Sequence, residues 1–215
     1  MPSGSDKVVA LRRLLDERFP AARARTARCV PTGVPAIDQA LGGGLLTGTL
    51  TEFVSECPSA GCQLSIGSLL QSTRLNRQRV ALIDTANAFD LEAFDDDALA
   101  HLVWVRCPSL SECWRAADLA ARDPNYAVIV VDVRGFPERA ILRTKDSIWT
   151  RLQRAAEQAE TALLIQTTTP LVPNAARRLG FGTPLAANTL VTSRADLIAT
   201  VHVELQRQRT REHAM

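Results

Sequence analysis

The hydrophobic positions of the chain fall into two kinds of segment. Short runs of apolar and β-branched residues are typical of strands buried on both faces of a parallel sheet, and they occupy 49–55, 79–84, 102–106, 126–132 and 162–168. Between them, apolar residues recur at helical spacing over about 61–75, 110–122 and 138–159. Strands that alternate with helices predict an α/β fold, a three-layer domain with a mainly parallel central sheet.

Cap residues mark the limits of two helices. Pro35 and Gly42 bracket a short helix, because proline suits the first helical position and glycine the position after the last. Ser109 and Glu112 form a capping box, which predicts that a helix begins at residue 110.

The C-terminal third contains fewer clear signals. A loop rich in proline, asparagine and glycine is expected over 169–184. Two closing strands are expected near 186–193 and 197–205, as an antiparallel edge of the sheet. The polar and basic residues 207–215 are expected to form a mobile tail.

The N-terminal segment predicts an amphipathic helix over 5–18, with apolar positions at Val8, Leu11, Leu14 and Leu15. Pro20 ends it, and a connector follows that holds Arg23, Arg25 and Arg28 without an acidic residue. This helix is a candidate for contact with a second copy, for contact with a partner, or for packing on its own sheet. We therefore divide the chain into a helical arm with a basic linker, a core and a basic tail, at 1–28, 29–206 and 207–215.

Composition restricts the possible classes of protein. The 215 residues are 46% hydrophobic and 22% charged with a net charge of +2, which is typical of an ordinary soluble domain without general affinity for polyanions. Five cysteines without C-x-x-C spacing and three histidines offer few zinc ligands, so reduced thiols in the cytoplasm are expected. No apolar run has the length of a membrane span, and no signal-peptide pattern is present, so no membrane contact is expected.

The stretch 41–70 contains a glycine turn, a buried strand, a loop of small residues and an apolar helix that begins near Gly61. This is the setting of a phosphate-binding loop, G-x-x-x-x-G-K-S/T. Aligned on Gly61, the chain has Glu56 in place of the first glycine, Cys62 in place of the lysine and Gln63 in place of the hydroxyl. The expected scaffold is therefore present without its phosphate-binding side chains.

Energetics argue against a nucleotide cofactor at this loop. Glu56 would repel each phosphate charge by about 1 kcal/mol in water and about 4 kcal/mol near a protein surface at ~4 Å. The amides of a helix N-terminus offset only about 0.3–1 kcal/mol at an exposed site. We expect no cofactor and no catalytic residues at this loop.

An acid-rich stretch follows over 84–97. Such stretches either hold a cation or form solvated loops and helix ends, and the second is the more common. We expect no metal site here.

Four segments, in order, resemble RecA-type recombinases. PTGVPAIDQALGGGLLTG at 31–48 resembles the approach to their phosphate loop, and ALIDTANAFD at 81–90 resembles their next strand and turn. YAVIVVD at 126–132 is similar to their second acidic strand, and ALLIQTTT at 162–169 to their sensor strand. The resemblance covers about 29–206 and implies a RecA-like fold.

The expectation about function rests on the positions where this chain differs from that family. The catalytic carboxylate of the recombinases falls at Ala86 and their sensor glutamine at Thr169, while Asp132 alone matches among the chemical positions. Together with the altered loop, these differences argue that the chain is not an enzyme. A short RecA-like chain without a nucleotide site resembles the ImuA family of bacterial translesion-synthesis accessory factors.

That resemblance implies partners. They are an ImuB-like, catalytically inactive homologue of Y-family polymerases, an error-prone replicative-type polymerase, and RecA or a second copy. It also implies a cytoplasmic, nucleoid-associated protein of the DNA damage response. The alternatives are a SulA-like cell-division inhibitor, which also lacks a nucleotide site, and a divergent ATPase.

RecA-type domains bind DNA through two loops, which implies candidate residues here. The first loop, 133–146, holds Arg134, Arg139, Arg143 and Lys145, and the second holds Arg177 and Arg178. Arg207, Arg209 and Arg211 of the tail extend this basic set. Few aromatic residues accompany them, so sequence-independent, salt-dependent contact with DNA phosphates is expected. Arg139 and Arg143 equally suit a solvated helix face.

Overall fold

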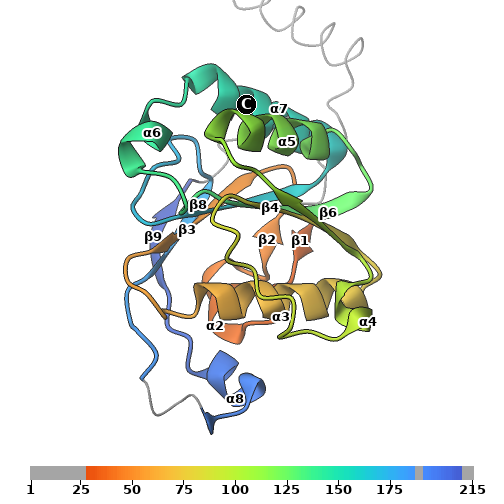
Figure 1. The fold of residues 1–215 in the computed structure, drawn as a ribbon, viewed down its shortest axis with the longest axis vertical. Helices are drawn as coiled ribbons and strands as arrows, with labels where there is room; N and C mark the ends of the chain where they lie inside the picture. The colour runs from red at the N-terminus through yellow and green to blue at the C-terminus, as the bar shows by residue number, and fades with distance from the viewer. Residues whose placement is uncertain (1–27, 187–190, 210–215) are drawn as a thin grey trace, which may run out of the picture.

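The computed structural model describes residues 28–186 and 191–209. A seven-stranded sheet with the order β5-β4-β6-β7-β3-β8-β9 lies at its centre (Figure 1). All neighbouring strands run parallel except β9, which is antiparallel to β8. The strands are β3 (Leu50–Ser55), β4 (Arg79–Asp84), β5 (Leu102–Arg106), β6 (Tyr126–Asp132), β7 (Ala162–Thr167), β8 (Arg177–Phe181) and β9 (Glu204–Gln208).

Helices cover both faces of the sheet. One face carries α2 (Pro35–Ala40), α3 (Cys62–Leu75), α4 (Asp96–Leu99) and α8 (Arg194–Ala199) (Figure 1). The other face carries α5 (Leu110–Ala121), the short α6 (Glu138–Leu142) and α7 (Asp146–Ala159). A separate antiparallel pair joins β1 (Cys29–Val30) to β2 (Leu45–Leu46). The predicted three-layer α/β fold is confirmed, and its arrangement is consistent with the RecA-like type.

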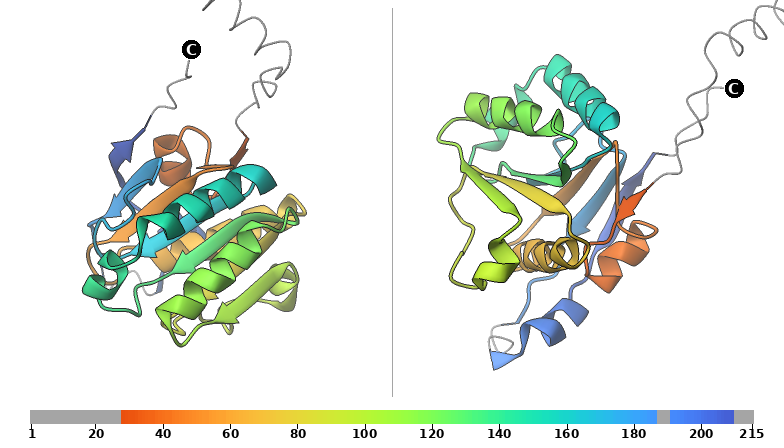
Figure 2. Two further views of the ribbon diagram at one scale, coloured as in Figure 1. Left: turned by 90° about the horizontal axis from the view of Figure 1, so that it is seen from above. Right: turned by 90° about the vertical axis from the view of Figure 1, so that its right-hand side faces the viewer.

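Strand β6 shows why the sheet is so apolar. Val128 and Val130 belong to the core between the sheet and α3, while Ile129 and Val131 belong to the core under α5 and α7. Burial on both faces accounts for a continuous β-branched run without alternation. Figure 2 shows α5 and α7 side by side over the sheet. Their cores meet at Trp114 and Trp149, whose rings pack edge to face with centroids 4.9 Å apart.

The prediction of one helix over 138–159 was wrong. The helix is divided, because α6 ends at Leu142 and α7 begins at Asp146. All five residues from Arg143 to Ser147 are polar, so no apolar side chain anchors this part of the chain to the sheet. Lys145 is in an extended conformation before α7.

The C-terminal prediction was wrong in detail. The expected loop over 169–184 contains β8, and the expected strand over 197–205 begins with the second half of α8. Strand β8 was missed because its sequence begins with two arginines, so its apolar run is short. Helix α8 begins after Ser193, whose hydroxyl accepts a hydrogen bond from the backbone N–H of Asp196 at 3.2 Å. The expected antiparallel edge is confirmed, as the pair β8–β9.

The proposed limits of the core also change. Arg207 and Gln208 belong to β9, so the division between 206 and 207 cuts a strand. The expected helix over 5–18, Arg211 and part of the expected strand over 186–193 lie outside the described residues. In the part of the chain that is described, no helix has the length and apolarity needed to cross a membrane.

The capping box that was predicted from sequence gives a first test of this fold. The Ser109 hydroxyl accepts a hydrogen bond from the Glu112 backbone N–H at 3.3 Å and donates one to the Glu112 carboxylate at 2.8 Å. Ser109→Ala should lower the free energy of unfolding by about 1 kcal/mol in urea denaturation, because an N-terminal amide of α5 loses its acceptor. Ser147→Ala, at an exposed serine on the second residue of α7, is the control, with an expected change within about 0.5 kcal/mol. Equal effects of the two substitutions would contradict a capping role.

Candidate functional site

The expected strand–loop–helix is confirmed between β3 and α3. The loop runs from Glu56 to Gly61, and Cys62 is the first residue of α3. Gly61 has a φ of 89°, a left-handed conformation that glycine adopts without strain. Backbone geometry of this kind permits a phosphate loop, so the side chains decide what the loop does.

A chain of polar contacts connects the loop to the two neighbouring strands. The Gln166 amide of β7 donates a hydrogen bond to the Cys62 Sγ at 3.0 Å. The carbonyl oxygen of the same Gln166 amide accepts one from Arg134 Nη2 at 3.3 Å. Arg134 Nε in turn donates to Asp132 Oδ1 at 2.9 Å. These four side chains fill the space beside the loop with contacts internal to the chain.

The ion pair neutralises the one acid that matched the recombinases. Asp132 is buried, and Arg134 is paired with it through two nitrogens, with only 18% of its side chain exposed. Burial of a carboxylate requires such a partner, since an unpaired buried charge is costly. Arg134 is therefore not among the side chains available to a DNA phosphate, and Asp132 has a structural partner.

Burial raises the pKa of the Cys62 thiol to about 12, against the opposing effect of the Arg134 charge. The thiol is therefore neutral at physiological pH. A neutral thiol supplies neither the positive charge of a phosphate-loop lysine nor a reactive thiolate. Gln63, the next residue, is exposed on the first turn of α3.

The C-terminal segment of the chain packs against part of the loop. The Leu185 backbone N–H donates to the Ser59 carbonyl at 2.9 Å, and the Gln206 amide donates to the Glu56 carboxylate at 2.7 Å. A Cβ atom placed on Gly61 would lie 3.0 Å from the Val201 side chain, so Val201 packs directly on this glycine. Gly61 and Cys62 at the N-terminus of α3 are therefore buried, while Glu56, Pro58, Ser59 and Gln63 stay exposed.

Ala86 and Thr169 are the other two positions taken from the recombinases. The Ala86 backbone N–H donates to Asp84 Oδ1 at 3.0 Å, and Gly135 packs so closely on Ala86 that a Cβ atom there would lie 2.8 Å from the Ala86 nitrogen. The Thr169 hydroxyl is buried without a hydrogen-bond partner among the described residues. Gln166 is the glutamine that faces the loop, three residues before the expected position. A polar residue inside the apolar run of β7 was the signal for it.

Local contacts also account for the acid-rich segment. Asp95 caps α4 by accepting a hydrogen bond from the Ala98 backbone N–H at 2.8 Å, and Asp97 pairs with Arg74. Within residues 28–186 and 191–209, no three His, Cys, Asp or Glu side chains gather in a way that would hold a metal ion.

Arg178 is bound to a buried carboxylate. Glu52 is fully buried in β3, and its Oε2 accepts a hydrogen bond from Arg178 Nε at 2.6 Å. Glu52 Oε1 accepts three more, from the Thr167 hydroxyl and the backbone N–H groups of Leu171 and Val172. Arg178 thus fastens the loop after β7 to the sheet, and it is not free to bind DNA.

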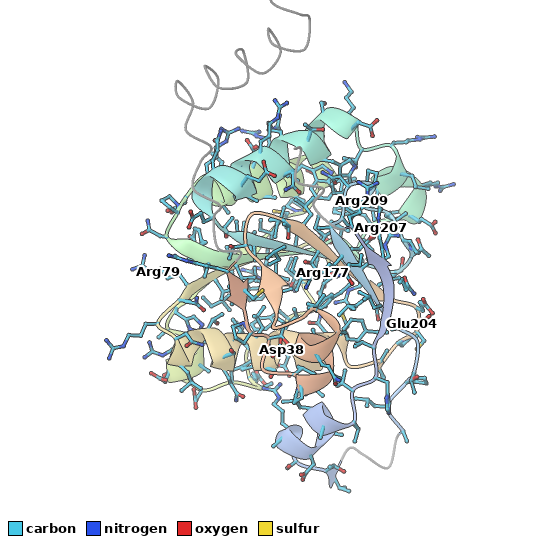
Figure 3. All side chains as sticks on the ribbon, turned by 180° about the vertical axis from the view of Figure 1, so that it is seen from behind. Asp38, Arg79, Arg177, Glu204, Arg207 and Arg209 are labelled. Atoms are coloured by element: carbon cyan, nitrogen blue, oxygen red, sulfur yellow. The ribbon has the colours of Figure 1, made fainter. Side chains whose placement is uncertain are left out.

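Arg177 points to the opposite face of the sheet. Its guanidinium lies against Gly42, where a Cβ atom would be 3.8 Å from Nη1, and this Nη1 is buried without an acceptor among the described residues. Arg177 pairs with Gln208 of β9, between Arg207 and Arg209, which are labelled with it in Figure 3. The two loop arginines are consequently not side by side on a surface.

The remaining basic candidates are exposed, except Arg207, which is half-buried. Arg139, Arg143 and Lys145 lie on α6 and the turn after it, with no ion-pair partner among the described residues. Arg207 lies opposite Arg178 in the β8–β9 ladder, and burial together with the charges of Arg209 and Arg178 lowers the pKa of Arg207 below its usual range. Arg209 is exposed at the end of β9.

A comparison with models of known protein families finds no match to this chain. The functional argument therefore depends on the geometry of the closed loop and on the arginines that stay exposed.

The buried arginines should stabilise the fold in a way that the exposed ones do not. Arg178→Ala leaves the buried Glu52 without its counter-charge and should lower the free energy of unfolding by about 3–5 kcal/mol in urea denaturation. Arg143→Ala removes the same side chain from an exposed position and should change it by no more than about 0.5 kcal/mol. Similar values for the two variants would show that Glu52 does not depend on Arg178.

The burial of Cys62 predicts its reactivity. Because burial raises the pKa of the Cys62 thiol and encloses its sulfur, iodoacetamide should not label it in the folded protein. Half-buried Cys57 is the internal comparison, and both cysteines should react in urea. Peptide mass spectrometry measures the two rates. Labelling of Cys62 at the rate of Cys57 in the native protein would mean that the loop is open in solution.

Proposed function

We propose that this protein is a non-catalytic RecA-like adaptor of the bacterial DNA damage response. In this proposal it supports mutagenic translesion synthesis by binding DNA and polymerase-type or recombinase-type partners. The observation that carries the proposal is the closed loop, in which Val201 packs on Gly61 and the Cys62 side chain is engaged with Gln166.

A closed loop changes how such a scaffold works. Recombinases of this type cycle between states because nucleotide binds the states with different affinity. A chain whose loop is filled by its own side chains has no such ligand, so its output comes from binding alone. The two kinds of surface that serve binding in the resembled family are basic DNA-facing elements and the N-terminal helix.

The partners follow from the resemblance. An ImuB-like inactive polymerase homologue and an error-prone replicative-type polymerase are the proposed protein partners, and RecA or a second copy are further candidates. The DNA contact is sequence-independent and salt-dependent, and the exposed Arg139, Arg143, Lys145 and Arg209 are available to it. The proposed location is the cytoplasm, at the nucleoid.

Deletion of the gene tests the function. Damage-induced mutagenesis should be lost while the damage-induced arrest of division persists, and the intact gene on a plasmid should restore mutagenesis. A Leu11→Asp/Leu14→Asp variant should fail to restore it, because charges replace the apolar positions of the sequence-predicted helix.

The control is the stability of the purified variant, whose urea transition should match the parent. Normal mutagenesis with loss of division arrest would contradict the proposal and favour a SulA-like inhibitor. Saturable binding of ATP with Mg²⁺ in calorimetry would contradict the closed loop itself.

A further inference from the structure

A basic groove, called here the α5–α7 groove, runs along α7 beside Arg122, the residue that follows α5. Figure 2 shows the two helices side by side. A hollow of about 480 Å³ is lined by Arg122, Ser147, Thr150, Arg151, Arg154, Ala155 and Gln158. A second hollow of about 260 Å³ shares Arg122, Ala155 and Gln158 with it, and adds Pro124 and Ala159. Together they follow α7 over nearly its whole length, which is about 20 Å at 1.5 Å per residue.

One carboxylate orients two of the three arginines in this groove. Asp118 accepts hydrogen bonds from Arg122 Nε and Nη2, both at 3.2 Å, and from Arg151 Nε at 2.9 Å. About half of each arginine side chain stays exposed, 53% for Arg122 and 48% for Arg151. Asp118 therefore holds the guanidinium groups in place and leaves most of their N–H donors facing solvent.

The charge of the groove is positive. Arg154 is exposed and has no ion-pair partner in the described part of the chain, so three guanidinium charges stand against the single Asp118 carboxylate. The lining contains no aromatic side chain on which a base would stack. Such a site favours phosphate groups over bases, because guanidinium groups bind phosphate oxygens through paired N–H donors.

We propose that the α5–α7 groove binds the phosphate backbone of a nucleic acid. This inference deepens the proposed DNA-binding function and rests on it. The groove is open and elongated, which suits a chain of phosphates better than a single enclosed anion. None of its arginines belongs to the two loops that the family resemblance implied, where Arg134 and Arg178 are occupied by buried acids.

The experiment measures binding of a single-stranded oligonucleotide to the full-length protein by fluorescence anisotropy, across a salt series. Arg122→Ala/Arg151→Ala/Arg154→Ala should weaken binding at least tenfold at low salt. It should also reduce the slope of log affinity against log salt by about 2, since each lost phosphate contact on a single strand removes about 0.7. Arg154→Glu, which leaves both Asp118 pairs intact, should weaken binding without any change in fold.

Two matched triple variants complete the design. Arg77→Ala/Arg79→Ala/Arg106→Ala removes three exposed arginines elsewhere and should bind like the parent. Arg139→Ala/Arg143→Ala/Lys145→Ala removes the exposed basic residues of the first loop, and should reduce affinity less than the groove variant.

The outcomes separate the two proposals. If the parent binds and both groove variants bind equally well, the groove is overturned while DNA binding stands. If the Arg77/Arg79/Arg106 control loses as much as the groove variant, binding reflects overall charge and the groove is again overturned. If the parent does not bind the oligonucleotide at 50 mM salt, both the groove and the DNA contact of the proposed function fail.

Discussion

Neutralisation of buried carboxylates is the constraint on which the interior of this protein depends. Glu52 and Asp132 lie inside the sheet, where an unpaired charge would cost several kcal/mol, and each is matched by one arginine. Arg178 reaches Glu52 from the adjacent β8, and Arg134 reaches Asp132 from two residues further along the chain. The same pairs that keep the core intact therefore determine which arginines remain for contact with other molecules.

The sequence predicted the parallel part of the sheet closely. Strands β4, β5 and β6 have the predicted limits, because each is a dense apolar run bounded by polar residues. Prediction failed where that contrast disappears. Strand β8 begins with two arginines. The polar residues from Arg143 to Ser147 interrupt the helix expected over 138–159, and no proline or glycine among them marks the break.

The sequence predicted which phosphate-binding side chains the loop lacks better than it predicted which contacts the loop makes. The replacement of a lysine by Cys62 was visible in sequence, and so was the survival of Asp132. The neighbour of Cys62 was not visible, because Gln166 comes from β7, more than a hundred residues along the chain. Arg134 is only two residues from Asp132, but sequence does not show that the two are paired. From sequence, Arg134 and Arg178 are two positive charges that could bind DNA. Only the structure shows that they are paired with the buried carboxylates of Asp132 and Glu52.

The strand order has a consequence for how the protein is made. Strand β3 is the first strand of the large sheet in sequence, and both of its neighbours, β7 and β8, come from the last third of the chain. A chain that emerges from the ribosome in order therefore holds β3 and the loop after it without sheet partners until about residue 162 has been synthesised. The pairing of β3 with strands so far along the chain slows folding, since distant segments must meet before their contacts stabilise them. During synthesis, Gly61 and Cys62, which are buried in the finished protein, are exposed to the surrounding solution.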